Sequence, residues 1–396
     1  MPRGGLKVLL FANTDWYLFN FRLPLAESLR DAGHEVVLVS PPGKYADLLV
    51  ARGFRHVALP FSRQGINPAA EIATIARLRA LYREEQPDLV HHFTIKCVLY
   101  GSIAARLAGR RNVVNAVPGL GHVFVDPGLR PFLLRPLVRM LYRFALRGTE
   151  VIFQNPDDRD SFLASGLLNR SSTHLIRGSG VNLARFRPAA RAAERTEVRV
   201  LFAGRLLKSK GVAEYVEAAH LARAKVPGLQ FFAAGEPDPG NPASCSAQTL
   251  QRWKQEADVQ FVGHSDDMAG LIMGSDIAVL PSHGEGLPRF LLESAAAGLP
   301  LIAADVPGCR EIVRHGVNGF LVPVRNARAL ADAILVLAGD PGLRARFGAE
   351  SRRIAGAEFA QEEVVRRTFE VYRLALGGDA RMGGKPAATP RNGDNA

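Results

Sequence analysis

An α/β protein with two domains, each built on a parallel β-sheet, is the fold that three observations on this sequence predict. Short apolar runs alternate with longer helical patterns along nearly the whole chain, which is typical of repeated βα units. One irregular stretch, rich in Gly, Ala, Arg and Pro, interrupts the series between residues 178 and 196. The 396 residues, 47% hydrophobic and 22% charged, supply enough apolar material for two cores, so bulk disorder is excluded.

Two series of buried strands are predicted, separated by helices such as one over residues 22–33. The first series comprises residues 7–12, 35–40, 56–59, 89–93, 113–117 and 151–154. The second comprises residues 198–203, 230–234, 259–262, 277–280, 301–303 and 319–322. The economical interpretation is two Rossmann-like domains, 1–177 and 197–361, joined by a linker over 178–196 and facing each other across a cleft.

The C-terminal part of the chain is predicted to contain one more helix and a tail. Residues 362–376 have an amphipathic pattern, and we expect this helix to pack back on the first domain. Residues 377–396 are polar and rich in Gly, Pro and Asn, so we expect them to be disordered.

Charge and cysteine content narrow the classes of function and the compartment. The formal net charge is +12, and residues 1–190 hold 25 basic and 14 acidic side chains, so the first half should meet something anionic. The apolar runs are too short for a membrane span or a signal-peptide core. The three cysteines lack metal-ligand spacing and are odd in number, which fits a reducing cytosol.

The loop after the strand 277–280 predicts an anion site. Gly286, Leu287 and Pro288 are expected to begin a helix there, because proline is tolerated in a first turn, and free backbone N–H groups would point to the carboxyl end of the strand. Glu285 precedes this helix, and Glu293 lies about two turns inside it among apolar residues. A carboxylate in that position needs a partner, which is either a ribose hydroxyl or an ion pair within the protein.

A second loop, after the strand 198–203, carries two cations. Gly204 and Arg205 open the loop, and Lys210 precedes Gly211, which closes a turn. Arg205 and Lys210 are placed to converge on a diphosphate. Taken alone, such a basic loop is more often a solvated turn, but the anion site predicted in the same domain favours phosphate binding.

At these motifs the chain resembles the GT4 glycosyltransferases, which have the GT-B fold and use nucleotide sugars with retention of configuration. The resemblance spans almost the whole length. Its C-terminal motifs are Gly204-Arg205 with Lys210-Gly211, Glu285 with Glu293, residues 303–313, and Gly316-Val-Asn-Gly319. Its N-terminal motifs are similar to those of the subgroup that acts on lipid-linked sugars in bacterial polysaccharide and glycan assembly; they are residues 19–24, 91–96 and 119–124.

The resemblance implies a role for each matched residue of the second domain. Arg205 and Lys210 would hold the donor diphosphate and stabilise the leaving nucleotide, and Glu293 would bind ribose. Glu285, with the amides of Gly286 and Leu287, would hold the donor sugar. The family favours a front-face mechanism in which the leaving phosphate takes the acceptor proton. No metal or other cofactor is expected, and the donor is expected to be a UDP-linked N-acetylhexosamine or hexose.

In the first domain, the resemblance and the residues together predict an acceptor site. The loop over 13–20 lacks the glycines that many relatives place near the diphosphate, so Asn20 and Arg22 are expected to contact substrate or the facing domain. The remaining candidates are Lys96, Gly119, Gly121 and His122. His122 does not match the position of the histidine found in many relatives, so it is not assigned as a base.

A basic apolar segment predicts attachment to a membrane. Arginines stand at 130, 135, 139, 143 and 147, and the last four recur every fourth residue beside leucines and aromatic residues. A helix of this kind suits an anionic membrane surface, which would place the protein peripherally on the inner face of the cytoplasmic membrane. The alternative is a core helix with a solvated cationic edge.

Several motifs keep a structural interpretation, and two other functions stay open. Asp158 and Asp160 form a D-x-D pattern, but they stand at a predicted helix start, where acidic residues complement the dipole. His91 and His92 are either core histidines or acceptor contacts.

A sugar-nucleotide epimerase on the same fold, or a non-catalytic protein that binds nucleic acid through its arginines, would share parts of the pattern; no nucleic-acid recognition module is evident.

Overall fold

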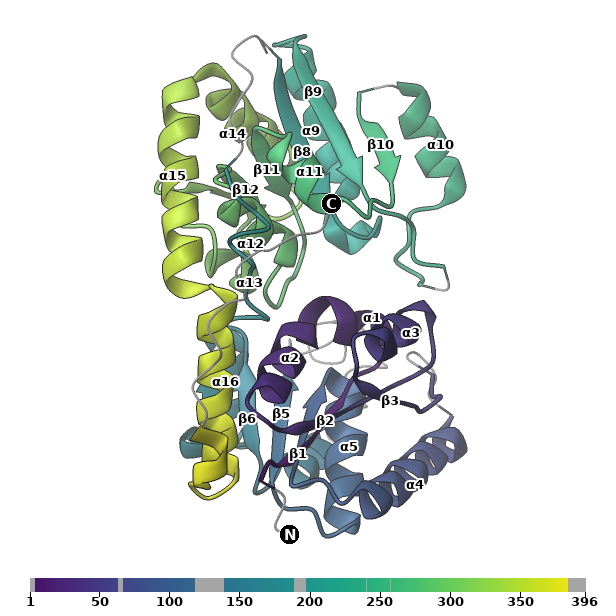
Figure 1. Ribbon diagram of the computed structural model, residues 1–396. Helices are drawn as coiled ribbons and strands as arrows, with labels where there is room; N and C mark the ends of the chain where they lie inside the picture. Colours follow the sequence, from purple (N-terminus) through teal and green to yellow (C-terminus); the bar gives the residue numbers. More distant parts are fainter. Residues whose placement is uncertain are drawn as a thin grey trace. The chain divides into compact units, whose positions relative to one another are not determined.

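The computed structural model describes residues 4–62, 67–117, 139–188, 197–239, 241–256 and 258–383. The chain divides into two compact units (Figure 1). The first unit contains residues 1–179 and 362–396, and the second contains residues 180–361. Each unit has its own parallel sheet and its own hydrophobic core, which confirms the predicted α/β class.

The first unit alternates strands and helices. Its strands are β1 (Lys7–Phe11), β2 (Glu35–Ser40), β3 (Arg55–Ala58), β4 (Leu89–Phe93), β5 (Val113–Val117), β6 (Glu150–Phe153) and β7 (Thr173–Leu175). Its helices are α1 (Asp15–Tyr17), the π-helix η1 (Leu18–Arg22), α2 (Leu23–Asp31), α3 (Lys44–Ala51), α4 (Pro68–Glu85), α5 (Ile95–Leu107), residues 139–146, α8 (Pro156–Ala164), the 3₁₀-helix η2 (Arg170–Ser172) and most of α16 (Gln361–Ala375).

The strand order of the first sheet is β3-β2-β1-β4-β5-β6-β7, and every pair is parallel. The order reverses between β1 and β4, and open α/β sheets generally bind ligands at the carboxyl ends of the strands at such a reversal. Six of the strands match the sequence prediction within about one residue. The three-residue β7 was not predicted, because so short a segment has no readable period.

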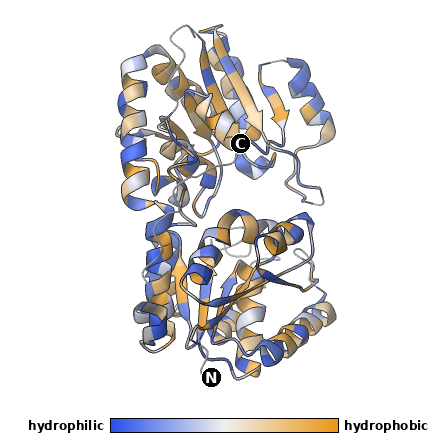
Figure 2. Ribbon diagram, in the orientation of Figure 1, coloured by the Kyte–Doolittle hydropathy of each residue, from blue (hydrophilic) through white to orange (hydrophobic). Residues whose placement is uncertain are grey.

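Alternation along β1 divides the first core into two layers. Val8 and Leu10 face one side of the sheet and pack with residues of α2 and α16, whereas Leu9 and Phe11 face the other side and pack with residues of α4 and α5. All four are fully buried. A parallel sheet covered on both faces requires such continuously apolar strands, and Figure 2 shows that hydrophobic residues dominate the strands of both sheets.

The segment after β1 differs from the loop that was predicted over 13–20. Thr14 caps a helical stretch, because its Oγ1 accepts a hydrogen bond from the amide of Tyr17 at 3.0 Å. Residues 15–17 then form α1, 18–22 form η1, and α2 follows without a break. Asn20 therefore lies on a helix that runs into α2.

The C-terminal helix α16 belongs to the first unit for almost all of its length. Val364, Val365, Phe369 and Tyr372 are buried in the same cluster as Val8 and Leu10. The chain continues into a 3₁₀-helix, η4 (Ala380–Gly383), in which Met382 is fully buried. The predicted disorder therefore does not extend over 377–383, since a single apolar side chain anchors this turn to the core; residues 384–396 lie outside the described residues.

The second unit repeats the arrangement. Its strands are β8 (Val198–Ala203), β9 (Leu229–Ala234), β10 (Gln260–Gly263), β11 (Ile277–Leu280), β12 (Leu301–Ala304) and β13 (Gly319–Val322). Its helices are the 3₁₀-helix η3 (Lys208–Lys210), α9 (Val212–Arg223), α10 (Ala247–Glu256), α11 (Met268–Met273), α12 (Arg289–Ala296), α13 (Pro307–Arg310), α14 (Ala327–Gly339) and α15 (Pro341–Glu358).

The second sheet has the order β10-β9-β8-β11-β12-β13, again all parallel, and it reverses between β8 and β11. Part of the stretch expected as a linker is built into this unit. Val181 forms a bridge with Ala360, and Val181 and Phe186 are buried in the second core. The described part of 178–196 is thus anchored by two apolar side chains; residues 189–196 lie outside the described residues.

Candidate functional site

The strand reversal in the second unit brings two sequence motifs to one edge of the sheet. The lysine loop (residues 204–211) follows β8, and the glutamate loop (residues 281–288) follows β11. Because β8 and β11 are hydrogen-bonded neighbours that run in the same direction, both loops begin at the same edge.

Backbone contacts join the lysine loop to the glutamate loop. The carbonyl oxygen of Ser209 accepts hydrogen bonds from the amide of His283 at 2.8 Å and from the Ser282 hydroxyl at 3.1 Å. Gly211 adopts a positive φ of 71°, and a Cβ at this position would lie 2.1 Å from the carbonyl oxygen of Pro281. Only glycine combines this conformation with this approach, so the turn predicted at Gly211 is required by packing as well as by φ.

Lys210 and Glu285 form an ion pair across the two loops. Lys210 Nζ lies 2.5 Å from Glu285 Oε1, and their side chains are 21% and 11% exposed. Both groups are therefore largely removed from water and compensate each other's charge. In a nucleotide sugar, the diphosphate and the sugar are joined by one bond, so a cation and a carboxylate this close together can contact the two sides of that bond.

Arg205 lies beside a different carboxylate. Its Nη1 is 2.6 Å from Asp238 Oδ2, and its side chain is about half exposed. The sequence pattern predicted that Arg205 and Lys210 converge on one diphosphate, whereas the structure pairs each cation with its own acid. Asp238 follows β9, so its proximity to Arg205 comes from the sheet and not from sequence spacing.

The helix after the glutamate loop begins later than predicted. Helix α12 starts at Arg289, and Pro288 is its N-cap residue with extended backbone. Gly286 and Leu287 thus precede the helix and lie outside its first turn, because Pro288 breaks the helical path in front of it. A close approach of the chain fixes this backbone, since a Cβ on Gly308 of α13 would lie 2.4 Å from the carbonyl oxygens of Glu285 and Gly286.

Glu293 is buried one turn into α12, and not two as predicted. Arg289 Nε lies 2.5 Å from its Oε1, which is the i,i+4 ion pair that the sequence left open as an alternative. Burial raises the pKa of the Glu293 carboxyl, while the charges of Arg289 and Arg185 act in the opposite direction. Glu293 therefore already has one cationic partner, and its carboxylate can still accept a hydrogen bond from a hydroxyl group.

Sequence reasoning missed a second bridge between these elements. His283 Nε2 lies 2.8 Å from Glu214 Oε1 on α9, and both side chains are mostly buried. His283 thus connects the glutamate loop to the lysine loop through its backbone and to α9 through its ring. The two residues are 69 positions apart, so no spacing in the sequence indicates their contact.

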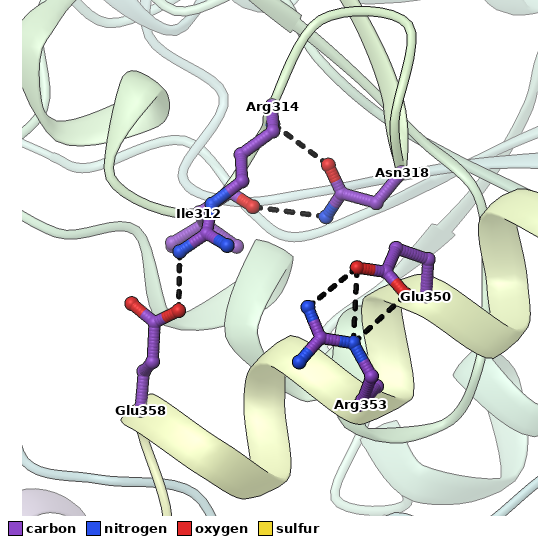
Figure 3. Close-up of polar contacts among 6 residues, drawn as sticks. All are labelled: Ile312, Arg314, Asn318, Glu350, Arg353 and Glu358. Carbon is purple, nitrogen blue, oxygen red and sulfur yellow. Dashed lines mark hydrogen bonds and ion pairs between the residues drawn. The ribbon is translucent and has the colours of Figure 1, made fainter.

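The motif Gly316-Val-Asn-Gly319 has a structural role (Figure 3). Asn318 is fully buried; its side-chain oxygen accepts from the amide of Arg314 at 2.7 Å, and its side-chain nitrogen donates to the Ile312 carbonyl at 2.9 Å. The Arg314 guanidinium bonds to Glu358, and the neighbouring helix α15 carries the pair Glu350 and Arg353. The contacts of Asn318 and Arg314 order the turn that leads into β13.

In the first unit, the acceptor candidates have different environments. Asn20 Nδ2 donates to the Trp16 carbonyl at 3.0 Å, which is a contact within its own helix. Lys96 is 2.7 Å from Glu71 Oε1. Arg22 is buried at 6% exposure. The structure therefore does not bring these three side chains into one described cluster. Gly119, Gly121 and His122 lie outside the described residues.

The two histidines and the D-x-D motif have structural partners. His91 Nδ1 lies 2.7 Å from the Tyr372 hydroxyl, and His92 bonds to Asn115 and Tyr82. The amide of Asp158 donates to the side chain of Asn155, the N-cap of α8, which supports the interpretation as a helix start.

Among the described residues, no group of three or more His, Cys, Asp or Glu side chains could hold a metal ion. The three cysteines are free and buried.

Two family models match the chain, one in each unit. A model for "Glycosyl transferase 4-like" proteins matches residues 7–155, and a model for "Glycosyl transferases group 1" matches residues 197–340. The second match contains both loops of the site. Together the two matches cover most of both sheets.

Relatives and solved structures extend the similarity over nearly the full length. The N,N'-diacetylbacillosaminyl-diphospho-undecaprenol alpha-1,3-N-acetylgalactosaminyltransferase of Campylobacter jejuni is 26% identical, over 90% of this chain and 95% of its own. The putative glycosyltransferase EpsD of Bacillus subtilis is 29% identical, over 95% and 98%. The structure of Anabaena HepE with UDP and glucose superposes with a TM-score of 0.75 at 21% identity, covering 92% of this chain and 98% of HepE, and shares the GT-B fold.

The contact between Gly211 and Pro281 gives a first prediction. Gly211→Ala should destabilise the second unit by about 1–3 kcal/mol from the backbone conformation alone, with a further loss because the two loops must separate. Urea unfolding followed by the fluorescence of Trp253, in a Trp16→Phe background, reports on this unit. The matched control is Gly228→Ala, because a Cβ there has open space; equal stability of the two variants would contradict the requirement for glycine.

Proposed function

We propose that this chain, which belongs to the GT4 glycosyltransferases of the GT-B fold, transfers a hexose or N-acetylhexosamine from UDP to a saccharide carried on a lipid diphosphate. The Campylobacter relative, named for action on a diphospho-undecaprenol saccharide, and the presence of UDP in the HepE structure support this choice. The observation that carries the proposal is the Lys210–Glu285 pair between two loops at the strand reversal.

The proposed chemistry places Lys210 at the leaving diphosphate. The bond between the anomeric carbon and the phosphate oxygen breaks, and negative charge builds on the diphosphate while the sugar ring becomes positive. The diphosphate competes with Glu285 for the Lys210 ammonium, and Arg205 adds a second cation from the same loop. Fixed charges of this kind stabilise a transition state because they need little reorganisation.

Glu285 is then placed to hold the donor sugar beside the reacting carbon, with the backbone of Gly286 and Leu287. The acceptor hydroxyl attacks on the face from which the diphosphate leaves, and its proton passes to the departing phosphate oxygen. This sequence needs no protein base and retains the anomeric configuration. Glu293, held by Arg289, accepts a hydrogen bond from a ribose hydroxyl of the nucleotide.

A mixed basic and apolar surface on the first unit supports attachment to a membrane. Met140 and Phe144, one helical turn apart, are 62% and 47% exposed, and Leu107 is 51% exposed. Arg143 lies on the same helix, and the Arg106 guanidinium lies 4.8 Å from the Phe144 ring centre. We assign this surface to anionic lipid on the inner face of the cytoplasmic membrane. Arg130 and Arg135 lie outside the described residues, and no described helix is long and apolar enough to span a bilayer.

The glycosyltransferase family match displaces the two alternatives from sequence. A sugar-nucleotide epimerase and a nucleic-acid-binding protein were considered because each would share part of the charge pattern. Both models name glycosyl transferases, and the matches contain the residues of the site in the second unit. We therefore propose neither alternative as a function of this chain.

Calorimetric titration with UDP, GDP and ADP in EDTA tests the donor. We expect selective binding of UDP without metal, and at least tenfold weaker binding to Glu293→Ala, because a buried carboxylate that pairs with ribose is removed. Glu350→Ala, on the exposed pair of α15, is the control and should bind as the wild type does. Equal affinity for all three nucleotides would contradict the choice of UDP.

Turnover of a Lys210→Ala variant tests the proposed chemistry. Loss of one group that stabilises the leaving charge costs about 3–4 kcal/mol, so kcat should fall at least a hundredfold. The matched control is Lys208→Ala, which removes the same charge from an exposed position two residues earlier in the 3₁₀-turn. Near-normal activity of Lys210→Ala with a normal melting temperature would refute the role of Lys210.

Sedimentation with liposomes tests the membrane surface. The protein should pellet with vesicles that contain acidic lipid and release as salt increases, because basic residues near a charged surface contribute about 1 kcal/mol each. Phe144→Glu should weaken pelleting, whereas Leu374→Glu, at an exposed apolar residue of α16, should not. No pelleting of the wild type with acidic vesicles at low salt would rule out this surface.

A further inference from the structure

Arg22 is a buried cation in the first unit whose described contacts are all with neutral groups. The residue is 6% exposed. Its Nη2 donates to the Tyr17 hydroxyl at 2.8 Å, and its guanidinium carbon lies 4.4 Å from the Phe93 ring centre. Its Nε is buried and has no hydrogen-bond partner among the residues that the structure describes.

Among the described residues, the printed contacts of Arg22 are with neutral side chains. The aromatic faces of Tyr17 and Phe93 attract a cation only weakly compared with the cost of removing it from water. His91 lies against Phe93, with ring centres 4.0 Å apart and ring planes tilted by 41°. Burial and the charge of Arg22 lower the pKa of His91, so it stays neutral. Tyr372, which bonds to His91, is kept as the neutral phenol because burial raises its pKa. A buried guanidinium in this setting calls for an anionic partner beyond those that the described residues supply.

The position of Arg22 in the fold is that of a ligand site. Arg22 ends the π-helix η1, and such helices are frequent at functional sites. Phe93 is the last residue of β4, which pairs with β1 at the strand reversal. The next residue, Thr94, has a positive φ of 74°, a strained conformation for a residue with a branched Cβ. The strained backbone of Thr94 and the charge of Arg22, which has only neutral described contacts, thus both lie at the carboxyl edge of the first sheet.

Aromatic side chains next to Arg22 indicate the other part of the ligand. Trp16 is 44% exposed and packs edge-on against Phe21, and Tyr17 stacks on Phe21 with ring centres 5.0 Å apart. These rings offer an apolar surface within the same short segment, 15–22, that carries the cation. A ligand with a phosphate and an adjoining apolar or sugar portion matches both features.

We propose that Arg22 binds a phosphate group of the lipid-diphosphate acceptor. The guanidinium offers a planar set of donors suited to phosphate oxygens, and Tyr17 orients it. This inference rests on the proposed function for the identity of the acceptor. The residues assigned to the donor diphosphate, Arg205 and Lys210, belong to the second unit, so Arg22 supplies a separate cation for the second substrate.

Steady-state kinetics on Arg22→Met, with a diphosphate-linked lipid acceptor, tests the proposal. We expect KM for the acceptor to rise at least tenfold while KM for the donor changes less than twofold, and Arg22→Lys should lie between the two proteins. The matched control is Arg30→Met, because Arg30 also stacks on a phenylalanine, Phe54, but is exposed. An unchanged acceptor KM, or a rise in donor KM alone, would overturn the proposal.

Thermal unfolding with an added anion tests binding at the same site without turnover. In saturating UDP, which fills the donor site, inorganic pyrophosphate should raise the melting temperature of the wild type and of Arg30→Met but not of Arg22→Met. Without ligand, Arg22→Met should melt at or above the wild-type temperature, because a buried uncompensated charge is removed. Equal protection of Arg22→Met would overturn the anion site.

The two measurements separate the site from the proposed function. If the wild type does not glycosylate any lipid-diphosphate acceptor but pyrophosphate protection depends on Arg22, the proposed acceptor class fails and the anion site stands. If the acceptor is used and Arg22→Met changes neither KM nor protection, the inference fails and the proposed function stands. Should Arg22→Met not fold, Arg22→Lys decides, since it keeps the charge and loses the planar donor set.

Discussion

The carbonyl oxygen of Ser209 is the point on which the site in the second unit depends. It accepts hydrogen bonds from the amide of His283 and the hydroxyl of Ser282, which joins the loops after two neighbouring strands. Two residues after Ser209, Gly211 lies against the carbonyl of Pro281. These backbone contacts bring Lys210 and Glu285 within ion-pair distance, although 75 residues separate them in the chain. The chemistry of the side chains follows from this junction of two loops.

Charge compensation distinguishes the two units. In the second unit each buried or half-buried charge of the site has an opposite partner, as in Lys210 with Glu285, Arg289 with Glu293 and His283 with Glu214. Such pairs hold the groups in place and can be exchanged for contacts with a charged substrate. In the first unit Arg22 has only neutral contacts among the described residues. A cation with a protein partner and a cation without one are expected to respond differently to substitution. Removal of the first leaves a carboxylate without its partner, whereas removal of the second leaves no described charge unpaired.

The two units share one topology, and the proposed function assigns a different substrate to each. Each sheet reverses its strand order once, between β1 and β4 or between β8 and β11, and in each case the candidate residues follow the strands at that reversal. The first unit presents aromatic rings and one buried arginine there, and the second presents paired charges. This division matches the amphiphilic acceptor and the strongly charged nucleotide donor that we propose for the two units.

The sequence by itself determined the fold class, twelve of the strands, the loops that carry Arg205, Lys210, Glu285 and Glu293, and the glycosyltransferase family. These follow from apolar runs at strand length, from the position of each motif directly after a strand, and from the pattern of the motifs. Tertiary structure decided the rest. The start of α12 at Arg289 depends on how Pro288 enters the helix, and η1 depends on packing after β1. The partners of His283, Arg205 and His91 lie 69, 33 and 281 positions away, and a sequence pattern with a period of two or 3.6 residues holds no information about contacts at such distances.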